Sequence, residues 1–215
     1  MIKYSVDVLI TFLIFGVFAF LHSLLASNRI KKSFANKFGD LIAFYRFAYV
    51  LFAIISFWMI YNFAPHEDLI IYDLPFPFDF LILVPQFLGL AGFLWTLKYF
   101  SSKEFLGINQ IVRWRSKEYN TADLDEELYF RIEGPYKFCR HPLYFFSIIF
   151  LLFRPEMDLF YLNFLICIIA YFYIGSIYEE KKLTEKFGDE YVKYQKNTPR
   201  IFPFFFKSLK TRFVK

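Results

Sequence analysis

Long apolar runs dominate this sequence and restrict the chain to a small set of folds. Three runs of about 20 residues, at 6–25, 41–63 and 80–100, are followed by a shorter run at 143–153 and a last long one at 159–178. A helix of about 20 apolar residues crosses the ~30 Å hydrocarbon layer of a bilayer. Sheet edges would leave backbone groups unpaired in lipid. The runs therefore predict an all-α integral membrane protein with about five transmembrane helices.

The composition agrees with this class. Hydrophobic residues make up 57% of the 215 residues, against about 45–50% in a typical soluble domain. We expect one membrane domain over 1–215, with three transmembrane helices in 1–100, a cytoplasmic loop at 101–142, a helical hairpin at 143–178 and an amphipathic cytoplasmic tail at 179–215.

The positions of the basic residues predict the orientation in the membrane. Lys and Arg gather in 26–40, 101–142 and 179–215, and the 64–78 loop has none. Basic loops stay in the cytoplasm, so these three stretches are expected inside, with the N-terminus outside and the C-terminus cytoplasmic. The net charge of +5 is then explained by topology and by anionic lipid headgroups, and we do not expect nucleic acid as a partner.

The tail shows a helical pattern with a break. Leu183, Phe187, Tyr191 and Tyr194 recur at helical spacing among lysines, which is typical of an amphipathic helix with its apolar stripe on the membrane or on the protein. Gly188 interrupts the pattern and is expected to end one helix before the next begins.

Polar residues that could carry chemistry concentrate just before the fourth run. Pro142 suits the first turn of a helix, which places Arg140 and His141 at the helix N-terminus. Backbone N–H groups and the helix dipole favour a carboxylate or phosphate there. The alternative, equally open from the residues alone, is that Arg140 extends to lipid headgroups.

The end of the fifth run carries two carboxylates. Glu179 and Glu180 fall on the same membrane side as Arg140 and His141, so a hairpin would bring the four together. A carboxylate near the bilayer is costly unless it is paired, and a solvated helix end is the alternative. His22 and Arg46 lie at similar depth, where a packing histidine and a headgroup anchor are the plain interpretations.

Several common site types are missing from the chain. It has no glycine-rich dinucleotide or phosphate loop, no paired-histidine metalloprotease motif and no serine elbow. The two cysteines, Cys139 and Cys167, have no metal-ligand spacing, and we expect no metal site.

Taken together, the motifs resemble a known family. Those that carry the resemblance are Gly134-Pro135-Tyr136, Arg140-His141-Pro142-Leu143-Tyr144, Glu179-Glu180, and the tail residues Phe187-Gly188-Asp189-Glu190-Tyr191, Tyr194, Pro199-Arg200 and Pro203. They resemble the isoprenylcysteine carboxyl methyltransferase and phospholipid methyltransferase superfamily. In the N-terminal half, 20–27, Tyr45-Arg46 and 105–110 are similar to the methanethiol S-methyltransferase and NnrU-like branch.

The resemblance implies an S-adenosylmethionine-dependent membrane methyltransferase, expected in a bacterial inner membrane, that takes a lipophilic or small-thiol acceptor. A thiol is the narrower expectation, because the N-terminal half is similar to the thiol branch. The residues that would bind the cofactor by this resemblance are Tyr136, Arg140, His141, Pro142, Tyr144, Glu179 and Glu180. Arg46 or Arg200 would orient an anionic acceptor, and His22 would help to deprotonate a thiol.

Three other functions stay open at this point. The acceptor could be an isoprenylcysteine carboxylate or a lipid. The chain could instead be a non-catalytic NnrU-like membrane protein. It could also be an NADPH-dependent sterol reductase, a class that shares the Arg-His-Pro element but usually continues with Asn-Tyr where this chain has Leu143-Tyr144.

Overall fold

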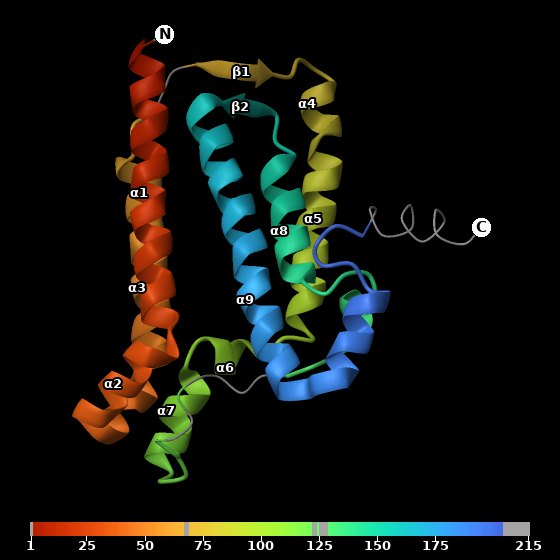
Figure 1. Cartoon of the computed structure of the whole chain (residues 1–215). Coiled ribbons are helices and arrows are strands. Elements are labelled where there is room, and N and C mark those ends of the chain that lie inside the picture. The colour runs from red at the N-terminus through yellow and green to blue at the C-terminus, as the bar shows by residue number, and fades with distance from the viewer. Residues whose placement is uncertain (1, 67–68, 122–123, 125–128, 204–215) are drawn as a thin grey trace. The chain divides into compact units, whose positions relative to one another are not determined.

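The computed structural model describes residues 2–66, 69–121, 124 and 129–203. Over these residues the chain is mainly helical (Figure 1). The elements in chain order are α1 (Ile2–Ala26), α2 (Asn28–Phe38), the 3-10 helix η1 (Gly39–Phe44), α3 (Tyr45–Phe63), β1 (Ile70–Asp73), α4 (Phe78–Leu81), α5 (Leu83–Leu97), α6 (Ser102–Phe105), α7 (Ile108–Arg115), the 3-10 helix η2 (Gly134–Lys137), α8 (Pro142–Leu152), β2 (Glu156–Asp158) and α9 (Leu159–Asn197).

Four helical stretches are long and apolar enough to cross a membrane. They are Tyr4–Ala26, Asn28–Phe63, Phe78–Leu97 and Leu159–Asn197. Many of their large apolar side chains are exposed, which is the favoured state when lipid is the solvent. The predicted all-α membrane class is confirmed. The remaining predicted run forms α8, an apolar helix of 11 residues that is shorter than these four stretches.

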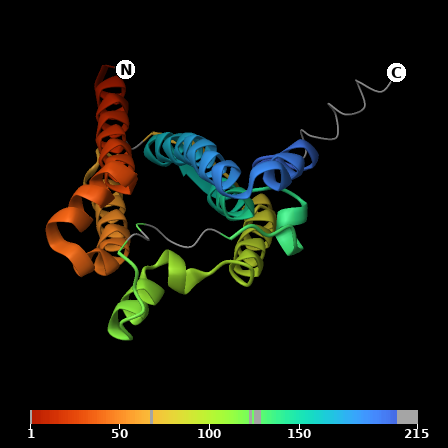
Figure 2. The same ribbon diagram turned by 60° about the horizontal axis from the view of Figure 1, so that its bottom comes forward.

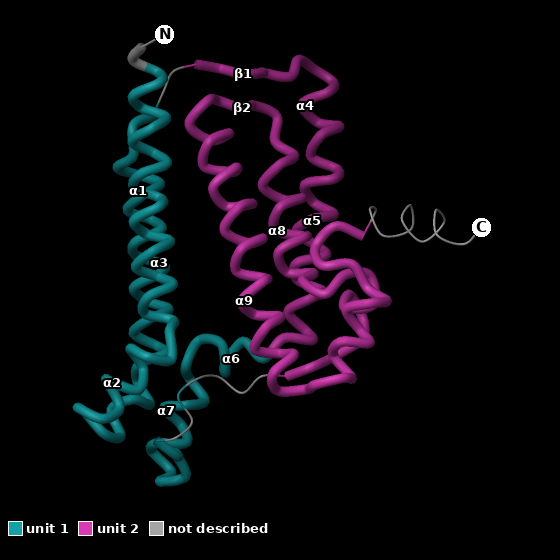
Figure 3. Tube along the Cα trace, in the orientation of Figure 1, with its two compact units in different colours: residues 1–67, 101–127 teal, residues 68–100, 128–215 magenta. Residues whose placement is uncertain are grey.

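The chain packs as two compact units (Figure 3). Unit 1 consists of Met1–Glu67 and Ser101–Glu127, and unit 2 of Asp68–Phe100 and Leu128–Lys215. The third apolar helix therefore groups with the C-terminal hairpin and not with the first two helices.

In unit 1, α1 and α3 run alongside each other (Figures 1 and 2). The hydroxyl of Tyr45, at the start of α3, donates to the carbonyl of Leu25, near the end of α1, at 2.8 Å. The short helices α6 and α7 contact each other, and α7 packs against η1 at this end of the unit. In that contact the rings of Phe44 and Trp114 lie 4.9 Å apart. Gly107 has a φ of +81° and approaches the backbone of α3 so closely that a Cβ would lie 2.5 Å from the amide nitrogen of Phe47.

In unit 2, α8 lies between α5 and α9 (Figures 1 and 2). Helices α5 and α8 are in the closest contact because two glycines of α5 face α8. A Cβ on Gly89 would lie 2.7 Å from the amide nitrogen of Phe150, and a Cβ on Gly92 would overlap the ring of Phe146. Small residues allow membrane helices to approach in this way.

The turn between α8 and α9 forms part of a small sheet. Strand β2 pairs antiparallel with β1, placing Ile70 opposite Asp158 and Asp73 opposite Glu156. Asp158 also caps α9, because its side chain accepts a hydrogen bond from the amide of Tyr161 at 2.7 Å. Sequence analysis did not predict this sheet.

Helix α9 continues past the predicted end of the hairpin to Asn197, with a kink at Gly188, where φ is 56° and ψ is −135°. The predicted interruption at this glycine is confirmed. Leu183, Tyr191 and Tyr194 are buried and pack with Phe130 and Phe187, so the apolar stripe of the tail faces protein. The end of the predicted tail, 204–215, lies outside the described residues.

Candidate active site

The hairpin of unit 2 brings the start of α8 next to the middle of α9. Arg140 binds Glu180 in a two-pronged ion pair, with its Nε 2.8 Å from Oε1 and its Nη2 3.0 Å from Oε2. The Nε2 atom of His141 lies 3.0 Å from Oε1 of the same carboxylate. The predicted proximity of the arginine–histidine pair and the double glutamate is therefore observed.

The local fold explains why Arg140 and His141 reach α9. Pro142 is the first residue of α8, as predicted, and His141 precedes it in a non-helical conformation, with φ of −122° and ψ of 66°. The backbone N–H groups of Arg140 and His141 donate to the carbonyls of Pro199 and Arg200, both at 2.9 Å. These bonds hold the segment after α9 along the start of α8.

Arg140 strengthens the same connection with its side chain. Its Nη1 donates to the carbonyl of Gln195 at 3.0 Å and to the carbonyl of Thr198. Arginine suits this place because its planar fork donates several bonds at once and its charge is permanent.

Glu180 is the centre of the cluster. Arg200 contacts it through Nε at 3.2 Å and Nη2 at 3.1 Å, and Gln195 donates through Nε2 at 3.1 Å. With Arg140 and His141, each carboxylate oxygen is approached by three side-chain nitrogens, and the side chain of Glu180 is only 3% exposed. A carboxylate accepts about four hydrogen bonds. The protein's own groups therefore use all of the hydrogen-bonding positions of Glu180.

Glu179 has different surroundings. Its side chain is 45% exposed, and its Oε2 is 3.4 Å from Nδ1 of His141 and 3.2 Å from the hydroxyl of Tyr144. Both contacts involve the same oxygen. Glu179 therefore presents a partly exposed carboxylate at the edge of the buried cluster.

Three flat rings stack beside Glu179. The rings of His141 and Tyr144 are 5.3 Å apart and nearly parallel, and those of Tyr144 and Phe172 are 4.6 Å apart and 9° from parallel. Sequence analysis missed Phe172. The available indication was its spacing, since it precedes Glu179 by two helical turns on one face of α9.

Burial and charge shift the pKa values of several groups around the start of α8. Burial alone would lower the pKa of His141, but hydrogen bonds and the charges of Glu179 and Glu180 outweigh it and raise the pKa above its usual value. Burial raises the pKa of the Cys139 thiol to about 12 and that of Tyr136 to about 12. We therefore expect His141 to stay protonated to a higher pH than a free histidine, and the thiol at Cys139 to be unreactive.

Tyr136 and Pro142 have supporting positions. The carbonyl of Tyr136, in η2, accepts a hydrogen bond from the hydroxyl of Tyr194 at 2.5 Å. Pro142 is buried at the start of α8. These contacts order the chain on both sides of Arg140.

The other predicted residues divide between the units. Arg200 belongs to the Glu180 cluster of unit 2, with its side chain 28% exposed. His22 and Arg46 belong to unit 1, where Nε2 of His22 is hydrogen-bonded to the hydroxyl of Tyr49 and Nε of Arg46 donates to the carbonyl of Phe105 at 2.9 Å. Tyr49 was not predicted, although it lies one turn after Arg46 on α3.

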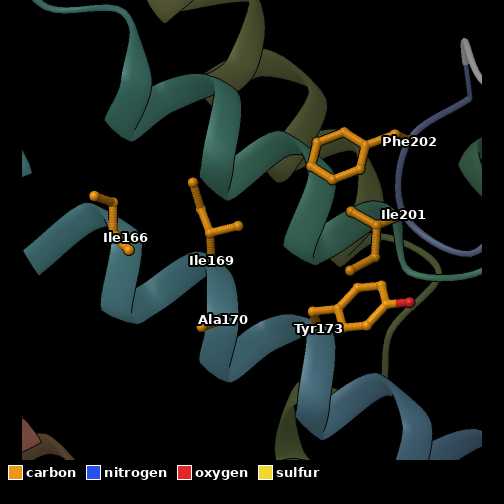
Figure 4. A pocket seen from close by; sticks show the side chains of 6 residues that line it. All are labelled: Ile166, Ile169, Ala170, Tyr173, Ile201 and Phe202. Carbon is orange, nitrogen blue, oxygen red and sulfur yellow. The ribbon is translucent and has the colours of Figure 1, made fainter. Parts of the chain in front are cut away.

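A shallow apolar cavity of about 330 Å³ opens on α9 (Figure 4). It is lined by Ile166, Ile169, Ala170, Tyr173, Ile201 and Phe202. The guanidinium of Arg200 lies 5.5 Å from the ring centre of Tyr173, so this apolar surface is continuous with the ionic cluster. Within the described ranges, no group of three or more His, Cys, Asp or Glu side chains is arranged to hold a metal ion.

The fold and the site together define a helical membrane protein with a buried arginine–histidine–glutamate cluster. The chain is similar to curated proteins named methanethiol S-methyltransferase. It is 28% identical over 203 residues to methanethiol S-methyltransferase 1 of Bradyrhizobium diazoefficiens, covering 91% of this chain and 67% of the relative. It is 26% identical over 198 residues to the Mycobacterium tuberculosis protein, covering 91% and 78%, and 27% identical over 195 residues to that of Crocosphaera subtropica, covering 88% and 72%.

No family model and no solved structure matches the chain significantly. The similarity to curated relatives nevertheless extends over most of the sequence. It confirms the resemblance to the methanethiol S-methyltransferase branch, and it supports methyl transfer as the class of activity.

Proposed function

We propose that this protein is an integral membrane methyltransferase that transfers a methyl group from S-adenosylmethionine to a small thiol. The observation that carries the proposal is that motif residues far apart in sequence, Arg140, His141, Tyr144, Glu179 and Glu180, form one cluster. The names of the relatives point to the same reaction.

The chemistry of the cluster fits the charged groups of this cofactor, which carries a sulfonium, an ammonium and a carboxylate. Glu179, partly exposed beside a stack of rings, suits a cationic group, because carboxylates and aromatic faces both attract cations. Arg200 is partly exposed and suits a carboxylate. Arg140, His141 and Glu180 would hold these groups in place, with Tyr144 binding Glu179 and with Tyr136 and Pro142 shaping the loop.

The reaction needs little from the protein besides positioning. The bound cofactor supplies an electrophilic methyl group, and a thiolate acceptor attacks it in line. Holding the acceptor in the right orientation and excluding water then provide most of the rate. In this proposal Arg46 or Arg200 orients the anionic acceptor, and His22 takes part in removing the thiol proton.

The proposed location is a bacterial inner membrane, with the N-terminus outside and the C-terminus in the cytoplasm. The basic stretches 26–40, 101–142 and 179–215 support this orientation through the positive-inside rule. The cluster would then receive its cofactor from the cytosol, and membrane lipids would surround the apolar helices.

A lipophilic acceptor is a second candidate. The apolar cavity beside Tyr173 has a volume of about 330 Å³, more than a one-carbon thiol needs. An isoprenylcysteine carboxylate or a lipid would use such a surface.

The decisive test is calorimetric binding of S-adenosylmethionine and of NADPH to the purified protein in detergent. We expect saturable binding of S-adenosylmethionine that weakens at least tenfold in Glu179→Gln. The matched control is Glu185→Gln, which changes another exposed glutamate of α9. Tight NADPH binding would instead favour a reductase, and binding of neither ligand would favour a non-catalytic protein.

The acceptor is tested with the same preparation. We expect dimethyl sulfide to form from methanethiol and S-adenosylmethionine, measured by gas chromatography of the headspace. Methylation of a prenylated cysteine but not of methanethiol would replace the thiol with the lipophilic acceptor.

A further inference from the structure

The ring stack beside Glu179 connects the two helices of the hairpin. Tyr144 of α8 lies nearly parallel to the ring of His141, with 4° between the ring planes, and to the ring of Phe172 of α9, with 9° between them. The ring centres are 5.3 and 4.6 Å apart, and rings at such distances attract each other. Phe172 therefore supplies the contribution of α9 to the stack.

The far end of Tyr144 reaches Glu179. The tyrosine hydroxyl donates to Oε2 of Glu179 at 3.2 Å, and Nδ1 of His141 lies 3.4 Å from the same oxygen. Within the part of the chain that the structure describes, both of these side-chain contacts use Oε2. They leave Oε1 of a carboxylate that is 45% exposed to a ligand.

The contact with Phe172 restricts how the Tyr144 hydroxyl can move. The hydroxyl of a tyrosine is fixed at the end of a rigid ring, so any tilt of the ring displaces it from its acceptor. A second ring packed face to face opposes that tilt, because the attraction depends on the relative orientation of the two rings. Phenylalanine has no polar atom, so Phe172 can hold the ring without competing for Glu179.

One polar residue lies between Phe172 and Glu179 on the same face of α9. Ser176 is fully buried, and its hydroxyl donates to the carbonyl of Tyr173 at 2.6 Å. A serine hydroxyl has a single proton to donate. Ser176 therefore does not donate to Glu179, and the ordering of this carboxylate depends on Tyr144 and His141.

We propose that Phe172 is a positioning residue for the binding of S-adenosylmethionine. Its ring holds the Tyr144 hydroxyl on Oε2 of Glu179, and Glu179 then presents Oε1 to a cationic group of the ligand. The inference rests on the proposed function, in which Glu179 binds such a group. Phe172 and Tyr144 should therefore contribute to the affinity as one unit and not as two independent residues.

The test is a double-mutant cycle with Phe172→Leu, Tyr144→Phe and the two together. Calorimetry measures the binding of S-adenosylmethionine to each purified protein in detergent. Each single substitution should weaken binding about tenfold, the effect of losing one hydrogen bond to a charged group. The double variant should also lose about tenfold, because Phe172 has nothing to position once the hydroxyl is absent.

Two results of the cycle would overturn the inference. A loss of about 100-fold in the double variant would show that the two residues act independently. An unchanged affinity in Phe172→Leu would show that the hydroxyl keeps its place without the stacked ring.

Phe164→Leu is the matched control for loss of packing. Phe164 lies two turns earlier on α9, stacks on Phe160 with ring centres 5.8 Å apart, and is buried, whereas Phe172 is only partly buried. The control should lower the unfolding temperature but keep the dissociation constant within about twofold of wild type. A tenfold loss of affinity in Phe164→Leu would assign the effect of Phe172 to general loosening of α9 and overturn the inference.

A conservative substitution provides a second check. Phe172→Tyr keeps a flat ring beside Tyr144 and should bind S-adenosylmethionine within about twofold of wild type. A loss as large as that of Phe172→Leu would contradict the role of the ring. Wild-type protein that does not bind S-adenosylmethionine would overturn the proposed function and this inference with it, whereas wild-type binding with additive losses would overturn the inference alone.

Discussion

Two neighbouring glutamates of α9 have opposite environments. Glu180 is buried and surrounded by Arg140, His141, Gln195 and Arg200, whereas nearly half of the Glu179 side chain is exposed. Successive residues of a helix point about 100° apart, so one of the pair faces the start of α8 and the other its edge. We interpret Glu180 as the residue that orders the cluster and Glu179 as the one available to a ligand.

Replacing the two glutamates separately tests this division. Glu180→Gln leaves the Arg140 and Arg200 charges without their buried counter-ion and should cost about 3–5 kcal/mol of stability. Glu179→Gln should cost less, at most about 1 kcal/mol, because its partly exposed pair with His141 contributes little, while it weakens cofactor binding. Thermal unfolding in detergent measures both. Equal destabilisation by the two substitutions would contradict the assignment.

The raised pKa of His141 leads to a prediction of how the stability of the protein depends on pH. Its folded-state pKa is raised, since Glu179 and Glu180 outweigh the effect of burial. Protonation of His141 therefore stabilises the fold fully below the unfolded pKa of about 6.5. This contribution is lost as pH rises through the higher folded value.

As the pH rises above about 6.5, we expect the unfolding temperature of the wild-type protein to fall. It should fall less in His141→Gln. His66→Gln, in an exposed loop residue, is the control and should keep the wild-type slope. A wild-type slope in His141→Gln would show that other groups cause the pH dependence.

At the scale of the elements, helix packing in unit 2 depends on glycines. A Cβ on Gly89 would lie 2.7 Å from the backbone of α8, which cannot move aside as a flexible side chain would. Gly16 of α1 has no atom within 4 Å of the corresponding position. The pair therefore separates a packing effect from the general effect of replacing glycine in a helix.

Gly89→Ala should destabilise the protein by about 1–3 kcal/mol, because overpacking forces the two helices apart. Gly16→Ala should stabilise it by about 0.5–1 kcal/mol through the lower flexibility of the unfolded chain. Both effects appear in thermal unfolding in detergent. Stabilisation by Gly89→Ala would show that α5 and α8 are less tightly packed than the structure indicates.

Some elements followed directly from local sequence. The start of α8 at Pro142 and the kink at Gly188 agree with expectation, because a missing N–H and a positive φ are properties of single residues. The helical pattern of the tail was predicted, but the β1–β2 sheet and the direct continuation of the fifth run into that tail helix were not. Three- and four-residue strands have almost no periodicity, and pairing between 70–73 and 156–158 depends on contacts distant in sequence.

At the scale of the whole molecule, the orientation in the membrane remains a prediction from charge. Single cysteines at Asp73 and Glu118, both exposed, can be introduced after replacing Cys139 and Cys167 with serine. In intact bacterial cells, a thiol reagent that cannot cross the membrane should label the cysteine at 73 and not the one at 118. The reverse pattern would invert the topology and place the basic stretches outside.

The sequence by itself determined the membrane class and the motif that carries the proposed function. The length of the apolar runs and the positions of the basic residues matter through their interaction with the bilayer. Both can therefore be recognised without knowing which residues touch. The similarity of Arg140-His141-Pro142 and Glu179-Glu180 to a family is likewise a property of the chain.

Only the tertiary structure decided which polar side chains are enclosed and which are exposed to a ligand. The exposure of Glu179, the enclosure of Glu180, and the contacts of Phe172 and Tyr49 depend on which helix faces lie together. Helical spacing leaves those faces undetermined, because many arrangements bury the same apolar stripes. Packing between helices selects one of them and thereby sets which carboxylate is enclosed and which hydroxyl lies beside His22.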